Sequence, residues 1–254
     1  MTRIESTLTE GVVTLRLASP ETSNALSPQD YAELAREVDR WETPDSGARA
    51  LVLTATGNVF SAGANLNALN SADPATLANS ISASILPLHN LLANGRLPTI
   101  AAVNGPAVGG AIGLALMCDI VLAARSARFS LAFARLGLIP DTGLTQRLPR
   151  LVGEARACAW MMTGADISAE EAESSGMIFR SVDDDDLANE AMALAKQLAQ
   201  LPLGTHQLIR AAMLAGRVAT FEQQIVLESR WQAERVNSNE FRDAISSFVA
   251  RHRS

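Results

Sequence analysis

The stretch NGPAVGGAIGLALMCD, residues 104–119, joins a glycine-rich turn to an apolar run that has the length of a short helix. Glycine lets a backbone approach a ligand closely, and the first N–H groups of a helix have no acceptor within that helix. Gly109 and Gly110 are therefore candidates to present backbone amides to a ligand. The alternative is tight packing of a buried strand, turn and helix, which needs no ligand.

The apolar run around this stretch indicates a soluble α/β core. Residues 97–124 are long enough to cross a bilayer, but Asn104, Pro106 and Asp119 interrupt them, so we predict no membrane span. Strand and helix patterns alternate along the chain, which is typical of an α/β fold. We expect strands over 12–17, 50–54, 99–103 and 120–123, and helices over 31–41, 76–92 and 109–117.

The pattern changes near residue 187, after which it is helical only. We expect helices over 187–200, 204–214, 221–236 and 241–251. The chain therefore divides into a predicted core over residues 1–186 and a C-terminal helical region over 187–254.

Composition narrows the classes of function. The 254 residues carry a net charge of −6 and few tyrosines or tryptophans, which disfavours a nucleic-acid-binding surface. Cys118 and Cys158 lack the spacing of metal ligands, and we expect two buried free thiols and no metal site. The first residues form no secretory signal, which favours a cytoplasmic location.

Four motifs stand in a fixed order along the chain: FSAGANL at 60–66, AAVNGPAVGGA at 101–111, MCD at 117–119 and GLIPDTGLTQRLP at 137–149. With NAL at 24–26, they resemble the enoyl-CoA hydratase/isomerase, or crotonase, superfamily over nearly the whole chain. The resemblance implies a spiral of ββα repeats whose C-terminal helical region serves oligomerisation and closure of the CoA pocket. It also implies an acyl-CoA thioester substrate, no cofactor beyond the CoA that the substrate carries, and a homotrimer or homohexamer.

The same resemblance assigns roles to backbone amides. It implies that the amides of Ala62 and Gly110 hold the thioester oxygen as an oxyanion hole, which stabilises the negative charge of an enolate. It also implies that the two loops around them bind the substrate. The further residues expected along the substrate are Leu26, Gly63, Ala64, Asn65, Leu66 and Gly109, with Asn65 standing where the family commonly has aspartate.

Two positions depart from the hydratase pattern. Gly113 and Phe133 match the two glutamates that hydratases of this family use to add water, and neither side chain transfers a proton. We therefore expect isomerisation rather than ordinary hydration. Because both polar groups are replaced, we also expect Gly113 and Phe133 to form an apolar wall that accepts a bulky or ring-bearing acyl group.

Asp141 is the predicted catalytic carboxylate. It resembles the aspartate with which ring-epoxyphenylacetyl-CoA isomerases move a proton beside the thioester, and an apolar pocket would raise its pKa toward that of a useful base. The alternative is a helix N-cap. His89 is a candidate second acid or base at the acyl pocket, and the alternative is a packed or solvent-facing histidine.

Three functions remain open at this point. The leading prediction is an acyl-CoA isomerase that transfers a proton through Asp141. The second is another reaction on the same scaffold: atypical hydration, or hydrolysis or dehalogenation of a CoA ester. The third is an inactive acyl-CoA-binding protein.

Overall fold

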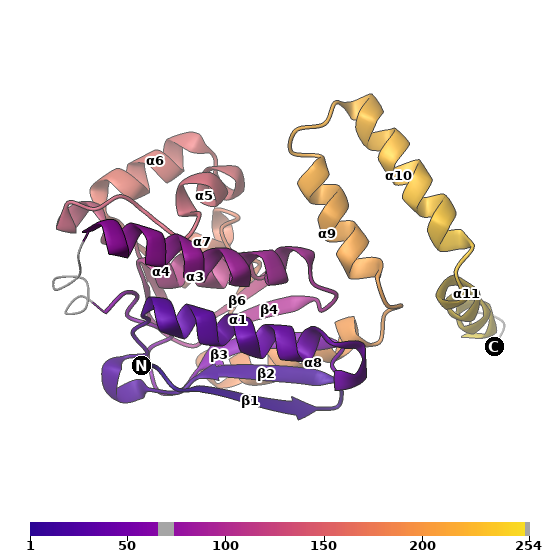
Figure 1. The fold of residues 1–254 in the computed structure, drawn as a ribbon, viewed down its shortest axis with the longest axis horizontal. Helices are drawn as coiled ribbons and strands as arrows, with labels where there is room; N and C mark the ends of the chain where they lie inside the picture. The colour runs from indigo at the N-terminus through magenta and orange to yellow at the C-terminus, as the bar shows by residue number, and fades with distance from the viewer. Residues whose placement is uncertain (66–73, 252–254) are drawn as a thin grey trace.

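A six-stranded sheet forms the centre of the molecule in the computed structural model, which describes residues 1–65 and 74–251 (Figure 1). Its strands pair in parallel except for the antiparallel pair β1 and β2. In spatial order they are β1 (Ile4–Thr9), β2 (Val12–Leu17), β3 (Ala50–Ala55), β4 (Thr99–Val103), β6 (Ile120–Ala124) and β9 (Arg180–Val182). A second sheet has the order β5 (Ala107–Val108), β7 (Arg128–Ser130) and β8 (Asp166–Ser168).

Helices follow the strands and cover the main sheet. The first helix begins as its sequence suggests, because Ser27 and Asp30 form a reciprocal capping box around Pro28. The helices are α1 (Pro28–Glu42), α3 (Pro74–Asn94), α4 (Gly110–Met117), α5 (Leu144–Val152), α6 (Glu154–Thr163), α7 (Ala169–Ser174), α8 (Leu187–Ala199), α9 (Thr205–Ala215), α10 (Phe221–Val236) and α11 (Asn239–Arg251). Every strand and helix predicted above is present, with ends that differ by at most three residues, the largest difference being at the start of α1.

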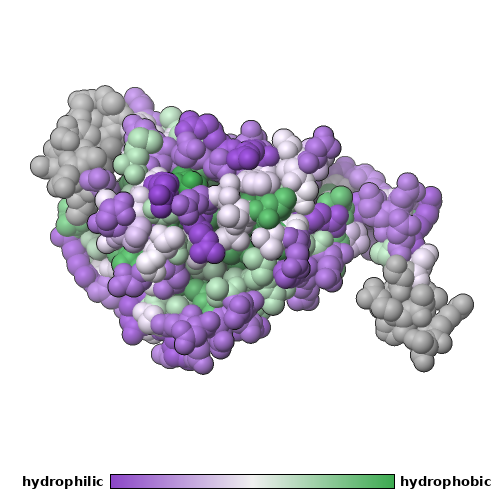
Figure 2. Space-filling view, turned by 90° about the horizontal axis from the view of Figure 1, so that it is seen from below, coloured by the Kyte–Doolittle hydropathy of each residue, from purple (hydrophilic) through white to green (hydrophobic). Residues whose placement is uncertain are grey.

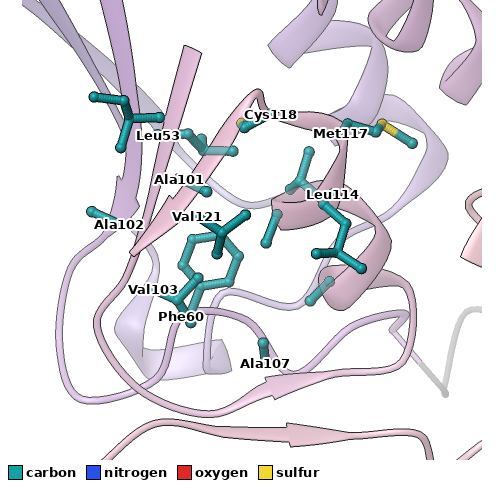
Figure 3. Close-up of a cluster of buried hydrophobic side chains, with 14 of the residues drawn as sticks. Leu53, Phe60, Ala101, Ala102, Val103, Ala107, Leu114, Met117, Cys118 and Val121 are labelled. Carbon is teal, nitrogen blue, oxygen red and sulfur yellow. The ribbon is translucent and has the colours of Figure 1, made fainter. Parts of the chain in front are cut away.

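The core lies between β3, β4, β6 and α4. All five residues of β4 are buried, as expected of a parallel strand that is covered on both faces. All eight residues of α4 are buried as well. Figure 3 shows Phe60, from the FSAGANL motif, lying beside Val103 and Val121 and opposite Leu114 of α4. Phe60 therefore anchors the loop that follows β3 to the centre of the core.

The C-terminal helices do not all leave the core. Helix α8 packs along β2, β3, β4 and β6, and it buries Leu187, Ala191 and Ala195. The expected boundary at residue 187 is therefore one helix too early. Helices α9, α10 and α11 form an arm that projects from the layered body (Figure 1), and neither α9 nor α10 has a fully buried residue.

The surface corrects one expectation about the cysteines. Cys118 is buried, but Cys158 is exposed on α6, because it lies on the side of that helix that faces away from the core. In the view of Figure 2, hydrophobic side chains gather in the middle of the face and hydrophilic side chains surround them. Among the described helices, none is long and apolar enough to cross a membrane.

Candidate active site

Two loops from distant parts of the chain pair beside the core. The N–H groups of Phe60 and Ser61 donate to the carbonyl of Pro106 at 3.1 and 3.2 Å, and the N–H of Val108 donates to the carbonyl of Ser61 at 3.0 Å. Gly63 lies at their closest approach: a Cβ there would press on the Val108 carbonyl and stand 3.7 Å from the Gly110 nitrogen. The sequence therefore needs glycine at position 63, where φ is also +79°.

Asn24 holds the first of these loops, which follows β3, in place through hydrogen bonds. Its fully buried amide donates to the carbonyls of Thr56 and Val59 at 3.0 and 2.9 Å, and its backbone carbonyl accepts from the Ser61 hydroxyl at 2.8 Å. The Asn24 side chain thus replaces regular strand pairing where the chain turns. The asparagine of the NAL motif therefore has a structural role, because its hydrogen bonds hold the first loop in place.

Leu26 does not make the substrate contact that was predicted for it. Its side chain is 2% exposed and belongs to the core, so it does not line a substrate path. Its backbone pairs with the first loop instead, donating to the Gly63 carbonyl at 2.7 Å and accepting from the Asn65 N–H at 3.3 Å. Leu26 therefore holds the loop, and Leu66, also expected along the substrate, lies outside the described residues.

The first oxyanion donor is also corrected. The Ala62 N–H donates to the Ser23 carbonyl at 2.8 Å, so it is already occupied and cannot serve a ligand without losing that bond. Among the described residues, the Ala64 N–H has no acceptor, and Ala64 is exposed. Ala64, two residues further along the loop, is therefore the free amide donor.

Gly110, the second predicted donor, lies at the start of α4. Gly110 is the first residue of α4, so its N–H belongs to the unpaired set at the helix N-terminus. Gly109 precedes it with φ +57°, and the buried Phe133 ring lies against Gly109, 3.5 Å from the position of a Cβ there. Phe133 thus packs an apolar ring against the turn before α4, and its contact with the acyl group stays a prediction.

Asp141 reaches this helix start from the loop before α5. Its Oδ1 atom lies 3.2 Å from the point where a Cβ on Gly110 would stand. Within the described structure, Oδ1 is buried and has no hydrogen-bond partner. Burial raises the pKa of the Asp141 carboxyl above its usual range, and the neighbouring Thr142 hydroxyl offsets only part of this rise.

The N-cap alternative for Asp141 is not what the structure contains. Helix α5 begins after Gly143, which has φ +78°, and no side chain caps it. Thr142 has φ +52°, an uncommon backbone conformation for a β-branched residue. The chain therefore places Asp141 in a strained turn, with its carboxyl directed at α4.

Thr142 was not predicted, and it changes the role of Gly113. A Cβ on Gly113 would stand 2.5 Å from the Thr142 Cβ, closer than real atoms approach. The space beside Gly113 is therefore filled by a threonine side chain and is not an open apolar wall. A glutamate at position 113 would not fit this packing.

Tyr31 is the second residue that sequence reasoning missed. Its side chain comes from α1 and is 7% exposed, and its Oη lies 3.3 Å from the same point above Gly110 that Asp141 approaches. The tyrosine at the fourth position of an amphipathic helix looks like an ordinary core residue. Only the packing of α1 against the start of α4 shows that its hydroxyl meets the site.

His89 lies beside the site and not at its centre. It is exposed on α3 and lines a cavity of about 310 Å³, whose wall also includes Thr142, Arg147 and His206. Neither Gly110 nor Asp141 belongs to this wall. The structure therefore does not bring His89 and Asp141 together as a pair.

Asp119 is a structural residue. Its carboxylate accepts from the N–H and hydroxyl of Thr99 at 2.8 and 3.0 Å and from two nitrogens of Arg210, each at 2.7 Å. Every one of these bonds ties α9 or β4 to the turn after α4. The carboxylate is fully engaged in joining these elements.

Comparisons with known proteins agree with this geometry. The sequence model of the enoyl-CoA hydratase/isomerase family matches residues 7–254. The chain is 41% identical to 1,2-epoxyphenylacetyl-CoA isomerase of Escherichia coli (strain K12), over 98% of this chain and 95% of that protein. It is 34% identical to 4-chlorobenzoyl coenzyme A dehalogenase-2 of Arthrobacter sp, over 84% of this chain and 78% of that protein.

The fold is also similar to that of solved structures of enoyl-CoA hydratases. A crystal structure of an enoyl-CoA hydratase from Polaromonas sp. JS666 matches with a TM-score of 0.93 and 30% identity, covering 98% of this chain and 97% of that chain. The spiral architecture predicted from the motifs is thus confirmed. A chain that is matched over nearly its whole length in sequence and in fold belongs to the enoyl-CoA hydratase/isomerase family of acyl-CoA-processing enzymes.

Proposed function

We propose that this enzyme isomerises an acyl-CoA thioester by proton transfer, with Asp141 as the base. The observation that carries the proposal is the buried Asp141 carboxyl, which is unpaired at Oδ1 and lies beside the first residue of α4. A buried carboxyl with a raised pKa is closer in basicity to an activated C–H than an exposed one is. Structural carboxylates such as Asp119 are fully hydrogen-bonded instead.

The proposed step conserves protons and electrons. Asp141 takes a proton from the carbon next to the thioester carbonyl, the C–H electron pair forms a C=C bond to the carbonyl carbon, and the carbonyl π pair moves onto the oxygen to give an enolate. The amides of Ala64 and Gly110 stabilise that oxygen, at roughly 3 kcal/mol for each donor in comparable sites. The protonated Asp141 then returns the proton to a different carbon of the conjugated system, so that the double bond has moved.

The residues of this site support hydration less well than isomerisation. Neither Gly113 nor Phe133 carries a proton-transferring group, and Thr142 occupies the space beside Gly113. Dehalogenation or hydrolysis would need Asp141 as a nucleophile and a base nearby, and His89 lies at a cavity that does not include Asp141. An inactive binding protein would have no reason to keep an unpaired buried carboxyl.

The proposal also covers the kind of acyl group that is bound and the number of chains that assemble. The Phe133 ring beside Gly109 favours an aromatic or other ring-bearing acyl chain over a short one. We propose that the enzyme works as a homotrimer or homohexamer, needs no cofactor apart from the CoA of its substrate, and acts in the cytoplasm. These statements extend what the family membership supports.

Incubation with unsaturated acyl-CoA esters in heavy water tests the reaction type. Isomerisation predicts deuterium at carbon in recovered substrate and product, with no gain of oxygen from the solvent. Uptake of ¹⁸O from labelled water into a hydroxyacyl product would show hydration, and release of free CoA or halide would show hydrolysis or dehalogenation. Binding of the ester without any label would support an inactive binding protein.

A further inference from the structure

Tyr31 and Asp141 approach the same point from different elements. The Oη of Tyr31 on α1 and the Oδ1 of Asp141 before α5 lie 3.3 and 3.2 Å from the place of a Cβ on Gly110. Gly110 has no side chain, so no atom of its own lies between the two oxygens, and the Thr142 Cγ2 methyl lies 3.2 Å from the same point. The absence of a Cβ therefore opens the space in which a phenol and a carboxyl can meet.

The raised pKa of Tyr31 limits its hydroxyl to donating a hydrogen bond. Burial raises the pKa of Tyr31, and the charges of Asp141 and Asp30 raise it further. The hydroxyl therefore stays protonated throughout the neutral range, and it can donate a hydrogen bond but cannot act as a base. A poor acid of this kind is also unsuited to delivering a proton to carbon.

In the described part of the chain, Oδ1 of the Asp141 carboxylate lacks a hydrogen-bond donor, and the Tyr31 hydroxyl is a donor. Oδ1 of Asp141 is buried without a partner in the described residues, while the Thr142 hydroxyl donates to the backbone carbonyl of Asp141 at 2.8 Å. A buried carboxylate that lacks a donor is costly, and a hydrogen bond to it favours its charged form. The ionised base is the form that must exist before each proton transfer.

The other charged groups around the pair are occupied or lie elsewhere. Asp30 on α1 accepts from the N–H of Thr2 and from both the N–H and the hydroxyl of Ser27. Helix α4 has no charged residue. His89 on α3 and Arg147 on α5 line the cavity beside Thr142 and not beside Asp141.

We propose that the Tyr31 hydroxyl donates a hydrogen bond to the ionised carboxylate of Asp141 and thereby directs Oδ1 toward the acyl carbon next to the thioester. Tyr31 is then a positioning residue, because it acts through Asp141 and not on the substrate. This inference rests on the proposed function, in which Asp141 is the base. It extends that function by naming the group that stabilises the base.

The first test needs no substrate, because Tyr31 is the single tyrosine of the chain. Protein labelled with ¹³C at the tyrosine Cζ should give one NMR signal, and its shift should follow the titration of Asp141. The response should disappear in Asp141→Asn and persist in His89→Gln, which changes a residue of the cavity beside Thr142. A wild-type signal that stays constant over the whole pH range in which the protein is folded, or one that titrates equally in Asp141→Asn, would overturn the proposal.

The second test is kinetic and uses Tyr31→Phe, which keeps the ring and removes only the hydroxyl. The exchange rate should fall by about tenfold or more, the range for a hydrogen bond to a charged group, with little change in KM. The acidic limb of kcat/KM should move to higher pH, because the carboxylate has lost a donor. A rate that falls equally at every pH, without this movement, would show that the hydroxyl serves something other than Asp141.

The two proposals fail in different ways. Full exchange by Asp141→Asn would remove the base itself and with it the proposed function. An enzyme that depends on Asp141 but shows neither the NMR response nor the shifted limb would overturn only the role of Tyr31. If Tyr31→Phe melts far below the wild type, the NMR titration of the unaltered protein decides alone.

Discussion

At the scale of single residues, Asp141 links the proposed catalysis to stability. Its carboxyl pKa is raised in the folded state by burial, so folding favours the protonated form. The stability that this preference contributes is present below the unfolded pKa, and it is lost as the pH rises through the folded pKa. The cost of holding Asp141 ionised therefore appears in the mildly acidic to neutral range.

Asp141→Asn should become more stable relative to the wild type as the pH rises from about 4 to 7. The asparagine stays neutral, whereas the wild-type carboxyl must ionise while buried. Urea unfolding of both proteins at several pH values measures this difference. Asp45→Asn, at an exposed aspartate, is the matched control and should show no such trend. A constant difference between Asp141→Asn and wild type across this range would contradict the buried, unpaired carboxyl.

Gly113 and Thr142 give a packing prediction. Gly113→Ala places a Cβ against Thr142 at 2.5 Å and should destabilise the protein by roughly 1–3 kcal/mol through overpacking. The double variant Gly113→Ala/Thr142→Ala should recover part of this loss, because it removes the Thr142 hydroxyl oxygen, which is the atom nearest to the added Cβ, although the Thr142 Cβ stays in place. Thermal or urea unfolding of the set measures the coupling, and a single variant as stable as the wild type would show that the two residues are not in contact.

At the scale of elements, the paired loops and the start of α4 determine which amides are free. The Ala62 N–H binds the Ser23 carbonyl, whereas the Ala64 N–H is unpaired among the described residues. Replacing Ala64 by L-lactic acid removes one N–H and leaves the side chain unchanged. This change should lower kcat by about 10²–10³-fold, as loss of an oxyanion donor does elsewhere.

The matched control is the same replacement at Ala62. It removes a structural hydrogen bond to Ser23, so it should lower the melting temperature more than it lowers kcat. The reverse pattern, with catalysis lost at position 62 and retained at 64, would restore Ala62 as the oxyanion donor.

The difference between these two alanines shows what sequence could and could not predict. Hydrophobic patterning correctly indicated the strands and the helix that begins at Gly110. Which amide of FSAGANL is free depends on Ser23, which reaches Ala62 only after the chain has folded. Tyr31 and Thr142 were missed for the same reason: their contacts with Gly110 and Gly113 join separate elements, and local spacing carries no record of them.

At the scale of the whole molecule, the projecting arm of α9, α10 and α11 is the surface through which the proposed assembly would form. Large apolar side chains on it are open to solvent, among them Met213 at 71%, Phe221 at 77% and Val226 at 70% exposed. Exposed apolar surface of this kind marks association sites. The arm also explains why the core ends at α8, since α9 and α10 bury no residue in the described part of the chain.

Light scattering coupled to size exclusion should therefore find three or six copies of the 26.9 kDa chain. The variant Phe221→Glu/Val226→Asp places charges on the apolar face and should reduce the mass, while the core, which these residues do not touch, stays folded. A wild-type mass of one chain at micromolar concentration would contradict the assembly. So would a double variant that keeps the full mass.

The central claim is that Asp141 moves the proton, and exchange at carbon measures it most directly. Wild type and Asp141→Asn are incubated with the same acyl-CoA ester in heavy water, with ester binding and melting temperature determined on both. The account predicts deuterium incorporation by the wild type and a rate about 10²–10⁴-fold lower in the variant, with binding and folding retained. Equal incorporation by a folded variant that still binds the ester would contradict it.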